Sequence, residues 1–182
     1  AITKMWKLNN CKLYTYRLID DKLMGAKHGN SMWLNLMKCK MNIMQIALEN
    51  GPVLLSDSDM VFFSKIVDID VNKFQVALSR HYIKDTDEKK YGKWNGGYVA
   101  SSDKSFPKWW VEHSNNSKFF DQGCLELVPS YYTYSEIPIT HNYGWWRINQ
   151  TGSEQERSDR LAKFDVAGNR ILYGDDELVS VH

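Results

Sequence analysis

The sequence has few cysteines, little net charge and no long apolar run. Cys11, Cys39 and Cys124 are odd in number, widely spaced and without the Cys-x-x-Cys pattern of a zinc or redox site, so we expect a reducing compartment. A formal net charge of +1 gives no reason to expect nucleic acid as a partner. No apolar run reaches the roughly 18 residues of a membrane span, and the amino terminus carries no signal-peptide pattern.

The size and composition of the chain fit one folded domain. With 182 residues, of which 43% are hydrophobic, the chain can bury one substantial core. Aromatic residues are frequent, with seven Trp and ten Tyr concentrated in the second half. Such rings either stack on sugar faces or fill the core, and composition leaves both open.

Hydrophobic patterning predicts helices that alternate with strands. Apolar residues recur at helical spacing over residues 31–50, and Asn50-Gly51-Pro52 ends that helix just before a buried strand at residues 52–55. A helix followed at once by a buried strand is an α/β unit, for which a mainly parallel sheet is usual. Further along we expect strands at 11–19, 74–79, 98–101 and 177–182, helices at 2–8, 107–114 and 121–127, extended segments at 131–134 and 137–140, a charged loop at 85–90, and a mobile loop leading into a helix at 152–161.

The pair Asp57 and Asp59 stands between two apolar runs, PVLL and MVFF. If the strand ends here, both carboxylates can turn toward one divalent cation, and hard oxygen ligands favour Mg²⁺ or Mn²⁺. The alternative is that Asp57-Ser58-Asp59 only begins a turn.

Three other segments are candidates to meet the aspartates at the carboxyl ends of the strands. Asn95-Gly96-Gly97 has little bulk and suits close approach of a ligand, or forms a hairpin turn. Asp121-Gln122 follows two aromatic residues and offers an acid and an amide, or begins a helix with Asp as its cap. His182, at a strand end, completes a metal shell or is a surface residue.

Taken in order, these motifs resemble a known family. A helix with Lys38 and Lys40, then GPVLLSDSDMVFF, WNGGYVASSD, FFDQGCLEL and a strand that ends in His are similar to metal-dependent retaining glycosyltransferases of the GT-A fold. The likeness is strongest to the small glycosyltransferase domain that chlorella viruses encode for their capsid glycans.

The resemblance implies a fold and an activity. The fold is α/β and GT-A-like, a single domain over residues 1–182 with a mainly parallel central sheet flanked by helices. The first strand of that fold, whose loop holds uracil and ribose, is expected to lie outside this sequence. The activity is transfer of a hexose or deoxyhexose from a UDP-sugar, UDP-glucose or UDP-rhamnose, to a glycan or glycoprotein acceptor, with Mn²⁺ or Mg²⁺ and retention of configuration. We expect a monomer in the cytoplasm, that of the host if the protein is viral.

The resemblance also implies a role for each motif. Asp59 and His182 would bind the metal, and Asp57 would reach the metal or the donor ribose, with Ser58 between the two aspartates beside the donor. Lys40, or Lys38 in another register, would place a cation near the nucleotide-sugar. Three residues would line the donor sugar, Asn95, Gly96 and Gly97, and two would lie beside its anomeric carbon, Asp121 and Gln122. A diphosphate leaving group gains negative charge while the anomeric carbon gains positive charge, so this placement is complementary.

Three alternatives stay open. In a phosphatase of the haloacid-dehalogenase type, VLLSDSDMV would supply Asp57 as nucleophile and Asp59 as general acid, and Asp175-Asp176 would be the late acidic motif. A non-catalytic carbohydrate-binding module would account for the aromatic content alone. His141, in the segment HNYGWWR, is a second choice as metal ligand, and otherwise contacts an acceptor sugar or belongs to the core.

Overall fold

The computed structural model describes residues 31–66, 69–71, 73–81, 85–117, 120–149 and 152–182. The expected helix at 2–8 and strand at 11–19 lie outside these residues. Among the described residues, no helix is both long enough and apolar enough to cross a membrane.

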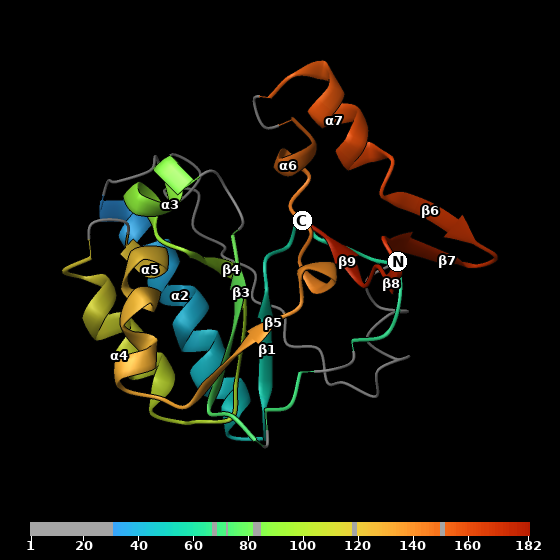
Figure 1. Cartoon of the computed structure of the whole chain (residues 1–182). Helices are drawn as coiled ribbons and strands as arrows, with labels where there is room; N and C mark the ends of the chain where they lie inside the picture. Colours follow the sequence, from blue (N-terminus) through green and yellow to red (C-terminus); the bar gives the residue numbers. More distant parts are fainter. Residues whose placement is uncertain (1–30, 67–68, 72, 82–84, 118–119, 150–151) are drawn as a thin grey trace.

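A four-stranded sheet in the order β1-β4-β3-β5 forms the centre of the fold (Figure 1). Its strands are β1 (Val53–Ser56), β3 (Val76–Arg80), β4 (Trp94–Ser101) and β5 (Tyr134–Ile137). Strand β4 runs antiparallel to both of its neighbours, and only β3 and β5 pair in parallel. The expectation of a mainly parallel sheet is therefore not confirmed: the sheet is mixed, because β4 is inserted between β1 and β3 in the opposite direction.

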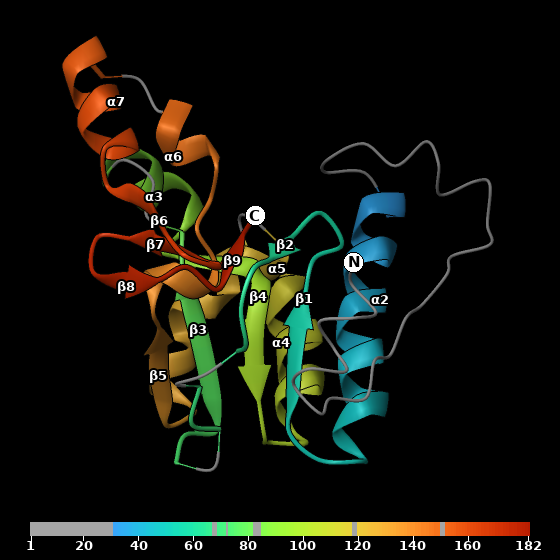
Figure 2. The same cartoon turned by 90° about the vertical axis from the view of Figure 1, so that its right-hand side faces the viewer.

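Helices cover one face of this sheet (Figure 1). Figure 2 shows α2 beside β1, with α4 and α5 behind the sheet. The helices on this face include α2 (Ser31–Leu48), α4 (Phe106–Ser114) and α5 (Phe120–Gly123). The described residues also form α3 (Asp85–Tyr91), α6 (Trp146–Asn149), α7 (Glu154–Leu161) and the 3₁₀ turns η2 (Cys124–Ser130) and η3 (Ile139–His141).

Two smaller sheets lie on the other side. Strand β2 (Val61–Phe62), just after the paired aspartates, pairs with β9 (Ser180–Val181) near the end of the chain. The other sheet joins β6 (Phe164–Ala167), β7 (Arg170–Tyr173) and β8 (Asp176–Glu177), and its β6–β7 hairpin projects from the body beside α7 (Figure 1). The pairing of β2 with β9 brings His182 close to Asp59, although the two are far apart in the sequence.

The strands of the central sheet bury side chains on both faces. Along β3, Val76 and Leu78 pack against the helices, and Ala77 packs on the other face, as the two-residue period of a strand requires. Along β4, Val99 faces the helices while Tyr98 and Ala100 face away. The central sheet is thus a rigid support for the side chains at its edge.

The predicted helix at residues 31–50 is confirmed as α2, and its apolar residues are buried at the predicted spacing. The methionines at the predicted spacing, Met37, Met41 and Met44, are buried together with Leu48. Gly51 then adopts φ 127°, a left-handed conformation that glycine tolerates, and the chain turns directly into β1.

Other elements differ from the expectation. The charged segment at 85–90 is helix α3 and not a loop: its last turn carries Lys89 and Lys90, which suit the negative end of the helix dipole. The strand expected at 98–101 starts at Trp94, so Asn95-Gly96-Gly97 lies within β4 and not in a turn. The helix expected at 121–127 divides into α5 and η2, which carries Pro129.

The last third also departs from the prediction. A capping box between Ser153 and Glu156 starts α7 at Glu154, where a mobile loop was expected. Residues 137–140, expected to be extended, pass from β5 into η3. The single strand expected at 177–182 is two short strands, β8 and β9, in different sheets, and the β6–β7 hairpin was not predicted.

Candidate functional site

The site lies at the edge of the central sheet where β1 ends. Because β4 is antiparallel to β1, the start of β4 lies beside the end of β1, and the Asp57 N–H donates to the Gly97 carbonyl at 2.8 Å. The antiparallel strand therefore places Asn95-Gly96-Gly97 next to the aspartates.

Three residues form a group that fits a divalent cation. Ligand atoms of Asp57, Asp59 and His182 all lie within 4.8 Å of one another. His182 Nε2 is 3.3 Å from Asp59 Oδ1 and 3.8 Å from Asp57 Oδ2. The Asp59 side chain is 76% exposed, so water has access to the group. Two carboxylates facing one imidazole nitrogen form a donor set suited to Mn²⁺ or Mg²⁺.

Neighbouring side chains orient His182 for such a role. Asn142 Oδ1 lies 3.1 Å from His182 Nδ1, and the Asn142 Nδ2 amide donates to Ser79 Oγ at 2.8 Å. With its amide held in this way, Asn142 offers its Oδ1 as an acceptor to the His182 Nδ1–H. His182 Nε2 then faces the two carboxylates, an arrangement common around metal-binding histidines.

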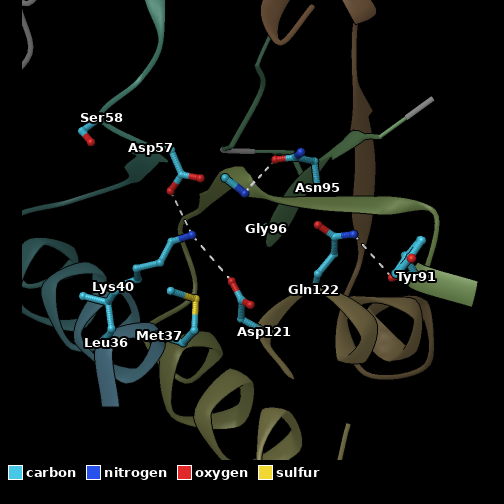
Figure 3. A pocket seen from close by; sticks show the side chains of 11 residues that line it. Leu36, Met37, Lys40, Asp57, Ser58, Tyr91, Asn95, Gly96, Asp121 and Gln122 are labelled. Carbon is cyan, nitrogen blue, oxygen red and sulfur yellow. Dashed lines mark hydrogen bonds and ion pairs between the residues drawn. The ribbon is translucent and has the colours of Figure 1, made fainter. Parts of the chain in front are cut away.

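A cavity of about 440 Å³ adjoins this group and shares Asp57 with it. Lys40 Nζ stands between two carboxylates, 2.9 Å from Asp57 Oδ1 and 3.6 Å from Asp121 Oδ2 (Figure 3). The lining residues come from α2, the segment after β1, α3, β4 and α5, and they are Leu36, Met37, Lys40, Asp57, Ser58, Tyr91, Asn95, Gly96, Gly97, Asp121 and Gln122.

The electrostatics of the cavity are those of a buried cation between two acids. Burial opposes the charge of Lys40, but Asp57 and Asp121 outweigh it, so the pKa of Lys40 lies above its usual value. Burial raises the pKa of Asp121, against the effect of Lys40 and with a contribution from Asp57. Lys40 therefore stays charged and holds the two acids near one another.

The two glycines of β4 allow this close packing. A Cβ on Gly97 would overlap the Asp57 carboxylate and the His182 ring, and one on Gly96 would lie 2.9 Å from Asp121 Oδ2. Asn95 Oδ1 accepts from the Gly97 N–H at 2.7 Å. The hairpin-turn alternative for this segment is thus wrong, and the small residues serve close approach.

Asp121 and Gln122 are fixed on α5 by different contacts. The backbone carbonyl of Asp121 accepts from Trp110 Nε1 at 2.6 Å, which anchors the start of α5 to the core. Gln122 Nε2 lies 3.1 Å from His81 Nδ1 and 3.4 Å from the carbonyl of Tyr91. Both side chains line the cavity opposite β1 (Figure 3).

The structure separates the two lysines and removes His141 from the site. Lys40 lines the cavity and Lys38 does not, because residues two apart on a helix point in different directions. His141 is 2% exposed, and Ser180 Oγ donates to its backbone carbonyl. His141 therefore belongs to the core, which was one of the three roles considered for it. Trp94, Trp109 and Trp110 are core too, whereas Trp145 is 56% exposed.

Sequence reasoning missed Asn142, Ser79, His81 and Tyr91. Their roles depend on contacts between β3, α3 and the segment after η3, and no local motif marks them. The only available signal was a histidine directly after a buried strand, in Ser79-Arg80-His81.

The geometry described above does not suit the phosphatase alternative. That reading requires an acidic group near Asp57 from Asp175-Asp176, but Asp176 lies in β8 of the separate three-stranded sheet. The groups that lie close to Asp57 are Asp59, which the phosphatase alternative also uses, and His182, which it does not use.

The domain is α/β, and at one edge of its sheet it combines two carboxylates, a charged lysine and an adjoining cavity. These features fit the class of proteins that bind a diphosphate-linked ligand. The chain belongs to the nucleotide-diphospho-sugar transferase family, whose model matches residues 2–140. This membership implies a GT-A-like fold, a glycosyltransferase-type activity and a nucleotide-sugar donor, and disfavours a non-catalytic module. The matched range includes the aspartates and Gln122 and ends before Asn142 and His182. No curated protein matches the chain.

Proposed function

We propose that this chain transfers a hexose or deoxyhexose from a UDP-sugar to a glycan acceptor, with Mn²⁺ or Mg²⁺ and with retention of configuration. The observation that carries the proposal is the shared position of Asp57. One of its oxygens faces Asp59 and His182, and the other contacts Lys40 in the cavity. A diphosphate held at the cation group would therefore place the attached sugar in the cavity.

The residues present fit a divalent cation, which would be held by Asp57, Asp59 and His182. Once bound, the cation would supply positive charge that stabilises the diphosphate leaving group. Lys40 adds a fixed positive charge on the same side of the cavity. With positive charge from both the cation and Lys40, the leaving group would not need a strong proton donor.

On the opposite side of the cavity, Asp121 and Gln122 would face the sugar. Oxygen atoms there would stabilise the positive charge that develops at the anomeric carbon. Asp121 is the candidate to hold sugar hydroxyls or to act as nucleophile. Asn95, Gly96 and Gly97 of β4 would form the wall of the cavity beside the sugar.

A thermal-shift panel tests the donor. UDP-glucose, UDP-rhamnose, GDP-mannose and ADP-glucose are each added with and without Mn²⁺, and a bound ligand raises the melting temperature according to its concentration over its dissociation constant. We expect stabilisation by UDP-sugars, with Mn²⁺ increasing the shift. Stabilisation by GDP- or ADP-sugars alone would show that the donor nucleotide is not UDP. Melting temperatures that do not change when a chelator is added would contradict a role for the metal.

Turnover of the preferred donor tests the roles around the anomeric carbon. Asp121→Asn and Gln122→Ala should lower kcat far more than they weaken donor binding, as for groups that act mainly in the transition state. Gln155→Ala, on the exposed helix α7, is the matched control and should leave kcat unchanged. Proton NMR of the new glycosidic bond reads the stereochemistry, and an inverted product would contradict retention.

A further inference from the structure

The orientation of the Gln122 carboxamide decides what the cavity presents to a ligand. An amide has an oxygen that accepts and an NH₂ that donates, and the two exchange places when the group rotates by half a turn. Beside a carbon that gains positive charge, the oxygen stabilises and the NH₂ group opposes. A contact that fixes the amide therefore fixes the chemistry of this wall.

The backbone carbonyl of Tyr91 determines which end of the amide points away from the cavity. This carbonyl lies 3.4 Å from the outer atom of the Gln122 amide, and a carbonyl can only accept, so that atom is the NH₂ nitrogen. Tyr91 is the last residue of α3, and the last carbonyls of a helix are not used within the helix. Figure 3 shows the Gln122 nitrogen toward Tyr91 and the oxygen on the side of Asn95 and Gly96.

His81 accepts the other proton of the same NH₂ group. Its Nδ1 lies 3.1 Å from Gln122 Nε2, and a contact to an NH₂ group requires an Nδ1 without a proton. The imidazole must then be neutral, with its proton on Nε2. Burial, helped by the charges of His182 and Arg147 and opposed by Glu88, lowers the pKa of His81 to about 4, so the ring is neutral at ordinary pH.

Both acceptors are held in place by contacts outside the cavity. Arg80 forms a two-point ion pair with Glu88, at 2.9 Å and 3.0 Å, which ties the end of β3 to α3. The backbone N–H of His81 donates to the Lys93 carbonyl at 2.7 Å, and the His81 ring meets Trp146 edge to face, with 5.2 Å between the ring centroids. His81 and Tyr91 are thus preorganised before any ligand binds.

We propose that His81 and the Tyr91 carbonyl are positioning groups that keep the Gln122 oxygen, and not its NH₂ group, directed into the cavity. His81 does not touch the sugar, and it acts through Gln122. The proposal rests on the proposed function, because the oxygen matters only if a cationic transition state forms beside it.

A set of single substitutions separates orientation from packing. His81→Phe keeps a ring against Trp146 but removes the acceptor, so we expect kcat to fall about 10- to 100-fold, with the dissociation constant of the UDP-sugar changed less than about twofold. His81→Asn places an amide oxygen near the position of Nδ1 and should restore kcat to within about threefold of wild type. His113→Phe, whose ring stacks on Trp109 in α4, is the matched control and should behave as wild type.

Equal losses in His81→Phe and His81→Asn would show a purely structural role, and full activity of His81→Phe would overturn the proposal as well. Nitrogen-15 NMR of the imidazole at neutral pH examines the same contact without catalysis. We expect a proton on Nε2 of His81, and a proton on Nδ1 would contradict the proposal even in an active enzyme. A protein with the expected tautomer that transfers no sugar would instead contradict the proposed function and leave the orientation of Gln122 standing.

Discussion

Asp57 is the residue that the two halves of the site share. It faces the Asp59 and His182 pair with one oxygen and Lys40 with the other. Asp59 differs from it in having a largely exposed side chain, so Asp59 contributes little to the fold and its charge is available to a cation. The two carboxylates should therefore respond differently to substitution.

Asp59→Asn should abolish Mn²⁺ binding while leaving the fold intact, because an amide in place of a carboxylate removes a full negative charge from the donor set. Calorimetric titration with Mn²⁺ measures the loss, and circular dichroism measures the fold. Asp175→Asn, an exposed acid in the turn before β8, is the matched control. Unchanged Mn²⁺ affinity in Asp59→Asn would exclude Asp59 as a ligand.

His81 makes the stability of the protein depend on pH. Its folded pKa of about 4 lies below the ordinary value of 6.5, so the unfolded chain binds the proton more tightly. The stabilising contribution is complete above about pH 6.5 and is lost as the pH falls toward 4, by on the order of 3 kcal/mol at most. The neighbours that act electrostatically on the ring are His182, Arg147 and Glu88.

Urea unfolding of wild type and His81→Asn between pH 7 and pH 4.5 tests this dependence. The difference in unfolding free energy between the two proteins should narrow as the pH falls, since only wild type carries the buried imidazole. Parallel curves would show that His81 titrates normally in the folded protein.

At the scale of elements, β4 determines the site through its direction and its glycines. An antiparallel β4 brings Gly97 beside Asp57, whereas a parallel strand would have placed its start at the opposite end of the sheet. The two glycines contact different residues: Gly97 packs against Asp57 and His182, and Gly96 packs against Asp121.

Gly97→Ala should weaken Mn²⁺ binding by about tenfold or more, because the added methyl group displaces Asp57 and His182 from their positions. Gly96→Ala is the matched comparison: its methyl group meets Asp121, so it should lower turnover and leave Mn²⁺ affinity near wild type. Equal Mn²⁺ affinities in wild type and Gly97→Ala would contradict the close approach seen at this position.

At the scale of the whole molecule, the cation group joins distant parts of the chain. Asp57 and Asp59 follow β1, whereas His182 follows β9, and the β2–β9 pairing holds the two regions together. A cation bound by all three residues would add a link between them that the unfolded chain lacks.

Mn²⁺ should therefore raise the melting temperature of the wild-type protein, with a stabilisation of about 2.7 kcal/mol at a concentration 100 times the dissociation constant. His182→Ala should lose most of this increment, while His113→Ala should keep it. The comparison uses the difference with and without Mn²⁺, so a lower stability of the variant itself does not affect the conclusion. A full increment in His182→Ala would show that the ion binds without this residue.

The sequence by itself determined the elements whose pattern is local. Helix α2 is set by the spacing of its methionines, β1 by its apolar run, and the position of Asp57 and Asp59 by their place directly after that run. The approach of His182 to them depends on the β2–β9 pairing. Tertiary structure decided the direction of β4, the choice of Lys40 over Lys38 at the cavity, the burial of His141 and the contacts of His81, Tyr91 and Asn142 with the site. The physical reason is that periodicity reports which side chains can be buried along one element, whereas strand direction and side-chain contacts depend on how separate elements pair.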